Sequence, residues 1–130
     1  MRFMKLKLLV IVSICLIVIG WVGLSTWIGY QVHAVCITAT KHYSGDCTDA
    51  LMKVVDEESF EYRFRNDAVW ALGQLGNRRS LPTLQRYFTG VVPPKENYDQ
   101  ALSQYELRKA ITLVTKGQNL TALWWRTDKN

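Results

Sequence analysis

Charged side chains are missing from one long stretch of the sequence. Between Leu8 and Thr40 there is no Asp, Glu, Lys or Arg. The apolar part, residues 8–28, contains roughly 20 residues, which at about 1.5 Å each in a helix cross a hydrocarbon core of about 30 Å. The apolar region of a secretory signal peptide is only about 7–15 residues long. The length therefore predicts a retained membrane helix, with residues 1–32 forming a cytoplasmic stub and the transmembrane segment.

Acidic residues are also missing from the N-terminal flank, which carries Arg2, Lys5 and Lys7. By the positive-inside rule, this cluster predicts a cytoplasmic N-terminus and a domain on the other side of the cell membrane, periplasmic or extracellular. These residues supply most of the formal charge of +5, since 13 basic and 11 acidic residues remain from Lys41 onward. Because the charges from Lys41 onward are nearly balanced, the basic excess gives no support for nucleic acid as a partner, and no nucleic-acid binding is expected.

Two features near the end of the apolar segment favour different interpretations, a retained membrane helix and a cleaved signal peptide. Trp21, Trp27 and Tyr30 are typical of the water interface of a membrane helix. The tripeptide Val-His-Ala that ends at Ala34 has small residues where signal peptidase requires them. Cleavage after Ala34 therefore stays open as the alternative, although the length of the apolar segment favours a retained anchor.

Histidine is scarce, and none follows His42. A Ser, Cys or Thr nucleophile in the rest of the chain would have no imidazole base within reach. The acidic cluster at residues 56–61 and the pair Arg78 and Arg79 are interpreted as solvated linker and turn residues. No catalytic residue, no cofactor and no enzymatic activity is predicted.

Only three cysteines are present. Cys15 lies in the apolar segment, where a thiol behaves as a small apolar group. Cys36 and Cys47 flank a polar stretch, and outside the cytoplasm they are expected to form a disulfide that closes residues 33–46 as a juxtamembrane loop. The alternative is a metal-binding or ligand-binding exported protein that uses His33, Cys36, His42 and Cys47. Their spacing matches no common zinc framework, so the disulfide is favoured and no metal site is predicted.

Beyond residue 46 no segment has strand-like alternation, and apolar residues recur at helical spacing. The pattern predicts helices over residues 47–56, 59–75, 80–90 and 98–116. Asp46 is expected to cap the first of them, and Gly76 to end the second. Ser103 and Glu106 match a capping box, so an alternative start for the last helix lies one turn later.

The strongest pattern lies at residues 65–77, RNDAVWALGQLGN, followed by SLPTL at residues 80–84. An Arg precedes Ala-x-x-Ala-Leu-Gly-x-Leu-Gly, and a second short helix supplies a paired Leu. Residues 47–57 also align with residues 80–90, which pairs Lys53 with Arg86. This segment resembles the HEAT-like repeat of the phycobilisome-lyase type.

The resemblance implies an all-α fold, a right-handed stack of antiparallel helix pairs used mainly to bind other proteins. The expected architecture is an N-terminal transmembrane helix followed by a short HEAT-like α-solenoid of about two helix pairs in residues 47–130. Lyase activity is not implied, because such repeats occur in unrelated proteins. The expected function is that of a membrane-anchored accessory or scaffold subunit, whose partner is another membrane or exported protein.

The partner-facing surface is expected on the polar side of the two short helices, because the inner helices of HEAT-like stacks line the concave face. Its residues would be Lys53, Gln85, Arg86 and Thr89. The equivalence of Lys53 and Arg86 places two cations one repeat apart, which suits an acidic or polar segment of a partner. An ordinary solvated face is the alternative interpretation.

The tail, residues 120–125, contains four large apolar side chains, Leu120, Leu123, Trp124 and Trp125. A solenoid of fewer than about three repeats needs caps on its open ends. We therefore expect the tail to fold over Leu107, Ile111 and Val114 as a C-terminal cap. The alternative is that Trp124 and Trp125 anchor a partner or the membrane interface, helped by Arg126 and Lys129.

Overall fold

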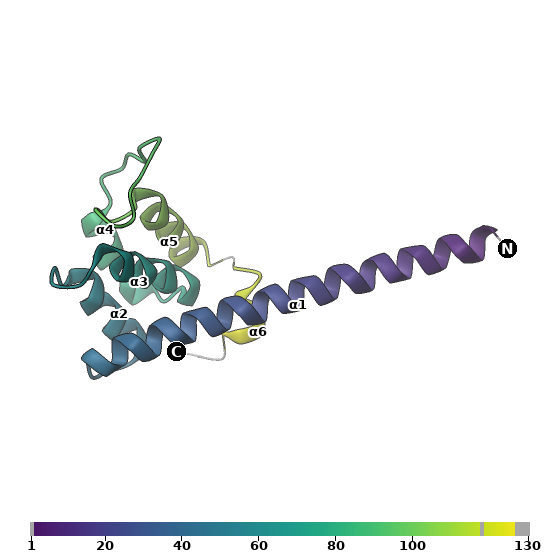
Figure 1. Cartoon of the computed structure of the whole chain (residues 1–130), viewed down its shortest axis with the longest axis horizontal. Helices are drawn as coiled ribbons and strands as arrows, with labels where there is room; N and C mark the ends of the chain where they lie inside the picture. The colour runs from purple at the N-terminus through teal and green to yellow at the C-terminus, as the bar shows by residue number, and fades with distance from the viewer. Residues whose placement is uncertain (1, 118, 127–130) are drawn as a thin grey trace.

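The computed structural model describes residues 2–117 and 119–126, which form an all-α structure (Figure 1). The described part contains one 3-10 turn and six α-helices, which are α1 (Arg2–His42), α2 (Cys47–Asp56), α3 (Tyr62–Leu75), η1 (Arg78–Ser80), α4 (Leu81–Tyr87), α5 (Gln104–Lys116) and α6 (Ala122–Trp125). The predicted fold class, a long apolar N-terminal helix followed by short helices, is confirmed.

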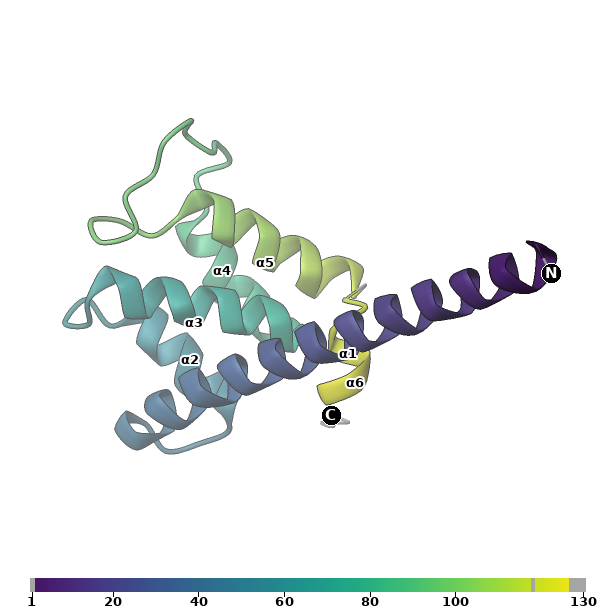
Figure 2. The same cartoon turned by 45° about the vertical axis from the view of Figure 1, so that its right-hand side comes forward.

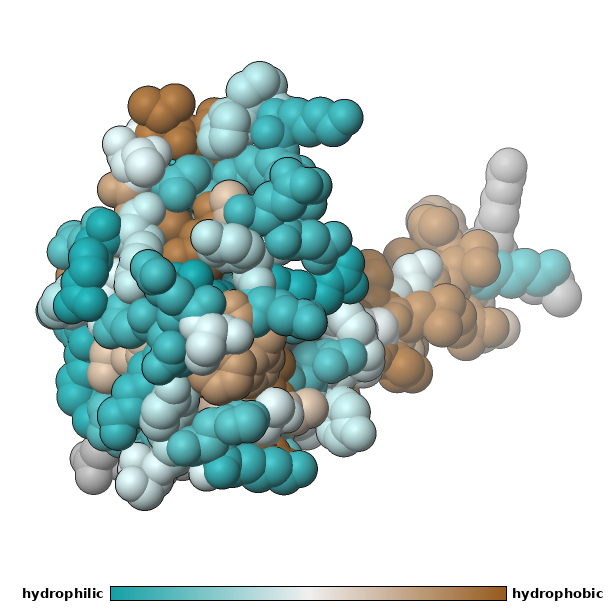
Figure 3. Space-filling model, turned by 60° about the vertical axis from the view of Figure 1, so that its left-hand side comes forward, coloured by the Kyte–Doolittle hydropathy of each residue, from teal (hydrophilic) through white to brown (hydrophobic). Residues whose placement is uncertain are grey.

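Helix α1 is a single helix of 41 residues, which corresponds to about 60 Å at about 1.5 Å per residue. Residues 3–21 are all exposed, and most of them are apolar. This part projects away from the other helices (Figure 1), and Figure 3 shows it as an apolar rod beyond a largely polar domain surface. By length and composition α1 is able to cross a membrane.

The end of α1 differs from the expected juxtamembrane loop over residues 33–46, because the helix continues to His42. The cause is packing. Val32, Cys36 and Ala39 follow one another at spacings of four and three residues and lie buried against the core. Only residues 43–46 remain to connect α1 to α2.

The helices pack in two layers (Figure 2). The C-terminal part of α1 lies beside α3, and α3 lies beside α5. Helix α2 covers α1 and α3 from the other layer, and α4 covers α5. The last third of α1 is therefore the first helix of the stack, although the sequence had placed the repeat domain entirely after residue 46.

The repeat motif contributes several small side chains to the core of the stack, which α1, α2, α4 and α5 also help to form. Ala68, Ala71 and Leu72 of α3 are fully buried. At Gly73 an added Cβ would lie only 2.7 Å from Cα of Ala110, so the backbones of α3 and α5 approach each other closely there. These residues of the motif thus form a packing surface between α3 and its neighbours.

Helix α5 begins at Gln104, at the alternative start, because the hydroxyl of Ser103 accepts a hydrogen bond from the N–H of Glu106 (3.1 Å). The preceding residues are kept out of the helix by the buried Asn66. Its side-chain amide donates to two carbonyl oxygens of the loop before α5, at 3.0 and 2.9 Å. The other ends of the four predicted helices lie within three residues of the expectation, whereas no helix was predicted at α6.

The disulfide between Cys36 and Cys47 joins α1 to the first residue of α2, with 5.2 Å between the two Cα atoms. Cys15 is free and exposed on the apolar part of α1. The pairing agrees with the sequence prediction. It fastens together the first two helices of the stack.

Replacing both Cys36 and Cys47 by Ser should lower the free energy of unfolding by about 3 kcal/mol, because the bond closes a loop of about 12 residues in the unfolded chain. Denaturant unfolding of the full chain in detergent, followed by near-UV circular dichroism, measures this change. The control Cys15→Ser should unfold like the parent. A double Ser variant as stable as the parent would contradict the stabilising role of the bond.

Candidate interaction surface

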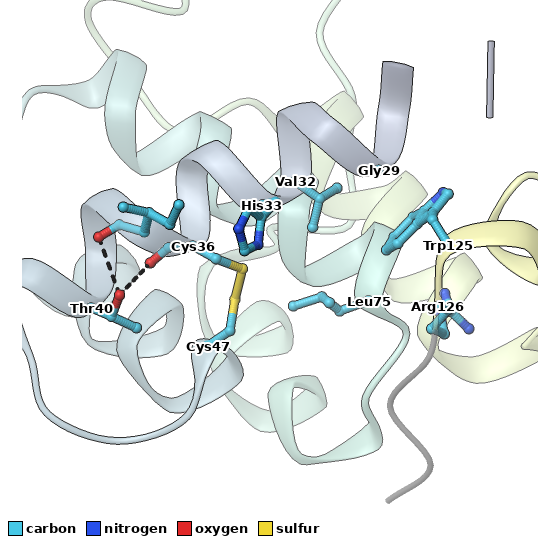
Figure 4. Close-up of a pocket in the computed structure, with 10 residues that line it drawn as sticks. Gly29, Val32, His33, Cys36, Thr40, Cys47, Leu75, Trp125 and Arg126 are labelled. Atoms are coloured by element: carbon cyan, nitrogen blue, oxygen red, sulfur yellow. Dashed lines mark hydrogen bonds between the residues drawn. A yellow bond between two sulfur atoms is a disulfide. The ribbon is translucent and has the colours of Figure 1, made fainter. Parts of the chain in front are cut away.

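A cleft of about 550 Å³ lies where α1, the start of α2, the end of α3 and the tail meet (Figure 4). His33 and the disulfide between Cys36 and Cys47 line one side of it. Trp125 and Arg126 line the other side (Figure 4). The cleft therefore offers one imidazole and one guanidinium beside an apolar wall.

The expected ligands of the metal-binding alternative are not assembled as such a site. Both sulfurs are bonded to each other, so they are not available as thiolate ligands. His42 packs edge-on against Phe60, with 5.1 Å between the ring centroids. Within residues 2–117 and 119–126, no three His, Cys, Asp or Glu side chains form a group that could hold a metal ion.

The C-terminal tail packs on α1 and on the end of α3. A Cβ added to Gly29 would lie 2.6 Å from the indole Cγ of Trp125, so the ring lies directly on the backbone of α1. The guanidinium of Arg126 donates to the carbonyl oxygen of Gln74. The side-chain amide of Asn119 donates to the side-chain oxygen of Gln74 at 2.7 Å. These contacts fix the tail at one side of the stack.

The tail therefore differs from the cap expected over Leu107, Ile111 and Val114. Leu107 and Val114 are already buried in the core, in which α5 packs on α3 and α4, so this face of α5 needs no further cover. The two tryptophans also differ from each other. Trp125 is half-buried, whereas Trp124 is exposed. Lys129, part of the alternative interpretation, lies outside the described residues.

The expected partner-facing residues divide into two groups. Lys53, Gln85 and Arg86 are exposed on α2 and α4, and we call these three residues the α2–α4 polar face. Thr89 lies beyond α4, where its N–H and its hydroxyl both donate to the side-chain oxygen of Gln104 (2.8 and 3.0 Å). Thr89 thus ties the end of α4 to α5.

The cations of the α2–α4 polar face have internal contacts. Nη1 of Arg86 lies 3.0 Å from Oδ1 of Asp56, which also accepts a hydrogen bond from the hydroxyl of Tyr87 at 3.0 Å. Nζ of Lys53 lies 5.7 Å from the centroid of the Tyr43 ring. Both side chains are exposed, and the exposed ion pair of Arg86 contributes little to stability.

Arg79 is an exposed turn residue, as predicted, and it also pairs with two carboxylates at the start of α2. Its guanidinium contacts Asp46 and lies 3.1 Å from Oδ1 of Asp49. Asp46 caps α2 by accepting a hydrogen bond from the N–H of Asp49 (2.8 Å). This hydrogen bond, together with the guanidinium of Arg79, lowers the pKa of Asp46. The turn before α4 is thereby attached to α2.

Arg65, the first residue of the repeat motif, has a structural role. Its side chain is buried, and Nε and Nη2 both donate to the carbonyl oxygen of Val55, at 3.1 and 2.8 Å. This carbonyl oxygen lies in the last turn of α2, so Arg65 fastens α3 to α2. The motif signalled the importance of this Arg, but its hydrogen-bond acceptor became evident only from the structure.

Comparison with known proteins agrees with the helical stack. Residues 64–89 match the family described as PBS lyase HEAT-like repeat. The matched segment covers most of α3, the turn η1 and α4. No match was found among curated proteins or among solved structures. The chain is thus an all-α protein that contains a HEAT-like repeat segment, a class of repeat associated with protein interaction.

Asp46→Ala should lower the free energy of unfolding by about 1 kcal/mol near neutral pH, because it removes the N-cap of α2. Folding lowers the pKa of Asp46, so the stabilisation by its charge is present above the unfolded-state value of about 3.9 and is lost as pH falls through the folded-state value. The difference between parent and variant should therefore shrink below about pH 4.

Denaturant unfolding at a series of pH values measures this difference. Asp99→Ala is the control, because it removes only an exposed ion pair with Arg63 and should have a smaller effect. A difference between parent and Asp46→Ala that stays constant down to the lowest pH would show that the charge of Asp46 has no part in stability.

Proposed function

We propose that this protein is a membrane-anchored HEAT-like module that binds another membrane or exported protein, with α1 as a retained anchor. The observation that carries the proposal is that one part of α1 is exposed and apolar, while another part of the same helix belongs to the core of the stack. Residues 3–21 are exposed and mostly apolar, whereas Val32, Cys36 and Ala39 of the same helix are buried in the stack. An exposed apolar helix of this length requires an apolar environment, and lipid provides it.

Packing favours retention of the anchor over cleavage after Ala34. Cleavage would remove Val32 from the core, and also Gly29, on which Trp125 packs. It would leave only residues 35–42 of the first helix of the stack, about two turns. The lost burial of apolar surface would destabilise the domain.

The proposed location of the domain is outside the cytoplasm. The basic N-terminal flank supports a cytoplasmic N-terminus. The disulfide between Cys36 and Cys47 supports an oxidising compartment for the domain that follows α1. Both features agree with a single-pass protein of the cell membrane.

The proposed binding surface is the α2–α4 polar face. The HEAT-like segment supports a role in protein interaction, and the inner helices of such stacks line the concave side. The two cations, Lys53 and Arg86, favour an acidic or polar segment of the partner. Arg86 can exchange Asp56 for a carboxylate of the partner, because its present ion pair is exposed.

Labelling of one introduced free cysteine in intact cells tests the topology, with Cys36 and Cys47 left in their disulfide. In a Cys15→Ser background, Lys95→Cys in the exposed loop before α5 should react with a membrane-impermeant maleimide before lysis. Met4→Cys, on the N-terminal flank, is the control, because it leaves Arg2, Lys5 and Lys7 in place, and it should react only after lysis. The reverse pattern would show that the domain is cytoplasmic.

Charge reversal tests the binding surface. Lys53→Glu combined with Arg86→Glu should reduce crosslinked partner recovered with the full chain from native membranes about tenfold or more, because two reversed interface charges oppose binding by more than about 1.4 kcal/mol. The control is Lys95→Glu combined with Lys116→Glu, which changes the net charge equally at exposed positions elsewhere. Equal recovery with both variants, each still folded by circular dichroism, would exclude this face.

A further inference from the structure

Three large apolar side chains of the tail are left uncovered. The exposed fractions of Leu120, Leu123 and Trp124 are 71%, 76% and 59%. They are adjacent to Ala122 and Trp125, which face inward, with Trp125 lying on Gly29 of α1. Helix α6 therefore has one side attached to α1 and an apolar side that faces away from the protein. Figures 1 and 2 both show α6 alongside α1, near the point where the stack begins.

The position of α6 along α1 relates it to the membrane, on the basis of the anchor proposed above. If the hydrocarbon core begins at Leu8, Gly29 lies about 32 Å further along the helix and Ser25 about 26 Å, compared with a core of about 30 Å. Ser25 is fully buried, whereas residues 3–21 are exposed, so the cover of α1 begins near this level. Helix α6 thus lies at the outer boundary of the hydrocarbon core.

The side chains at this level suit a lipid interface. Trp27 and Tyr30 of α1 are exposed, by 58% and 70%, within one turn of Gly29. Aromatic rings of this kind are enriched where the hydrocarbon meets the headgroups. Together with Trp124 they place three exposed aromatic side chains near the expected outer boundary. The apolar side of α6 then continues the lipid-facing surface of α1.

The size of the exposed area argues against a protein as the occupant of this surface. Trp124 can bury about 150–250 Å² and the two leucines are smaller, so the three side chains together offer less than the about 800 Å² that a stable protein interface buries on each partner. A lipid interface has no such minimum, because each inserted apolar side chain contributes separately.

We infer that the apolar surface formed by Leu120, in the turn before α6, and by Leu123 and Trp124 of α6 inserts into the outer interfacial region of the membrane as a second contact beside α1. One helix alone allows the domain to rotate about the helix axis and to tilt. A second contact at a fixed position on α1 removes most of this freedom. The α2–α4 polar face would then be presented to partners in one orientation relative to the membrane.

Quenching of tryptophan fluorescence by brominated lipids tests this inference in the full chain reconstituted into phosphatidylcholine vesicles. The reporter retains Trp124, with the other four tryptophans replaced by Phe. A second reporter retains both Trp124 and Trp125, so that the contact with Gly29 is preserved if the first variant folds poorly. Variants that retain only Trp21, in the membrane segment, or only Trp70, in α3, are the matched controls.

Trp124 should lose fluorescence with bromine at a shallow acyl position, and lose less with bromine at a deep position. Trp21 should be quenched and Trp70 should not. If Trp21 is quenched while Trp124 behaves like Trp70, α6 does not contact lipid although the anchor stands. If Trp124 is unaffected by bromine but shielded from acrylamide, a protein surface covers it, which also overturns the inference. Absence of quenching at Trp21 would instead contradict the anchor itself.

Discussion

Helix α1 is exposed and apolar in its N-terminal half and packs against other helices in its last turns, without a break between the two parts. Most of the structure depends on this constraint. Its N-terminal half is covered by no other helix of the described structure. Its last turns carry a stripe of buried side chains against α2 and α3. Because a helix is stiff over a few turns, the stack is attached to the apolar segment without a flexible linker. The disulfide at Cys36 strengthens this attachment at the point where the chain turns back into α2.

A short helical stack must also cover its two ends. In longer solenoids each repeat buries its neighbours, and terminal repeats carry polar outer faces. Here α1 covers one end, and the tail adds Trp125 on its surface. At the other end α5 buries Leu107 and Val114 on its inner side and exposes Arg108 and Thr112 on its outer side. A domain with few repeats is in this way closed without further helices.

Polar contacts connect α3 to α2, the turn η1 to α2, and α3 to the loop before α5. Arg65 satisfies a carbonyl oxygen at the end of α2, and Arg79 holds the carboxylates at its start. Asn66 holds the loop before α5. Arg65 and Asn66 are buried, and a buried polar group destabilises a fold when its partner is removed, so these two side chains favour one arrangement of the helices. That arrangement determines where the α2–α4 polar face lies relative to α1.

The sequence by itself determined the class of fold, the four helices within residues 47–116 and the cysteine pair. These features depend on local signals: helical spacing of apolar residues, the glycine at position 76, the cap at Ser103 and the repeat motif of α3. Only the tertiary structure decided where α1 ends and where the tail packs. No local stop signal precedes His42, and the stripe of Val32, Cys36 and Ala39 has meaning only against the helices that cover it. Likewise, the sequence of the apolar tail is compatible with packing on several apolar surfaces. In the structure the tail packs at Gly29, where the absence of a side chain lets the Trp125 ring approach the backbone of α1.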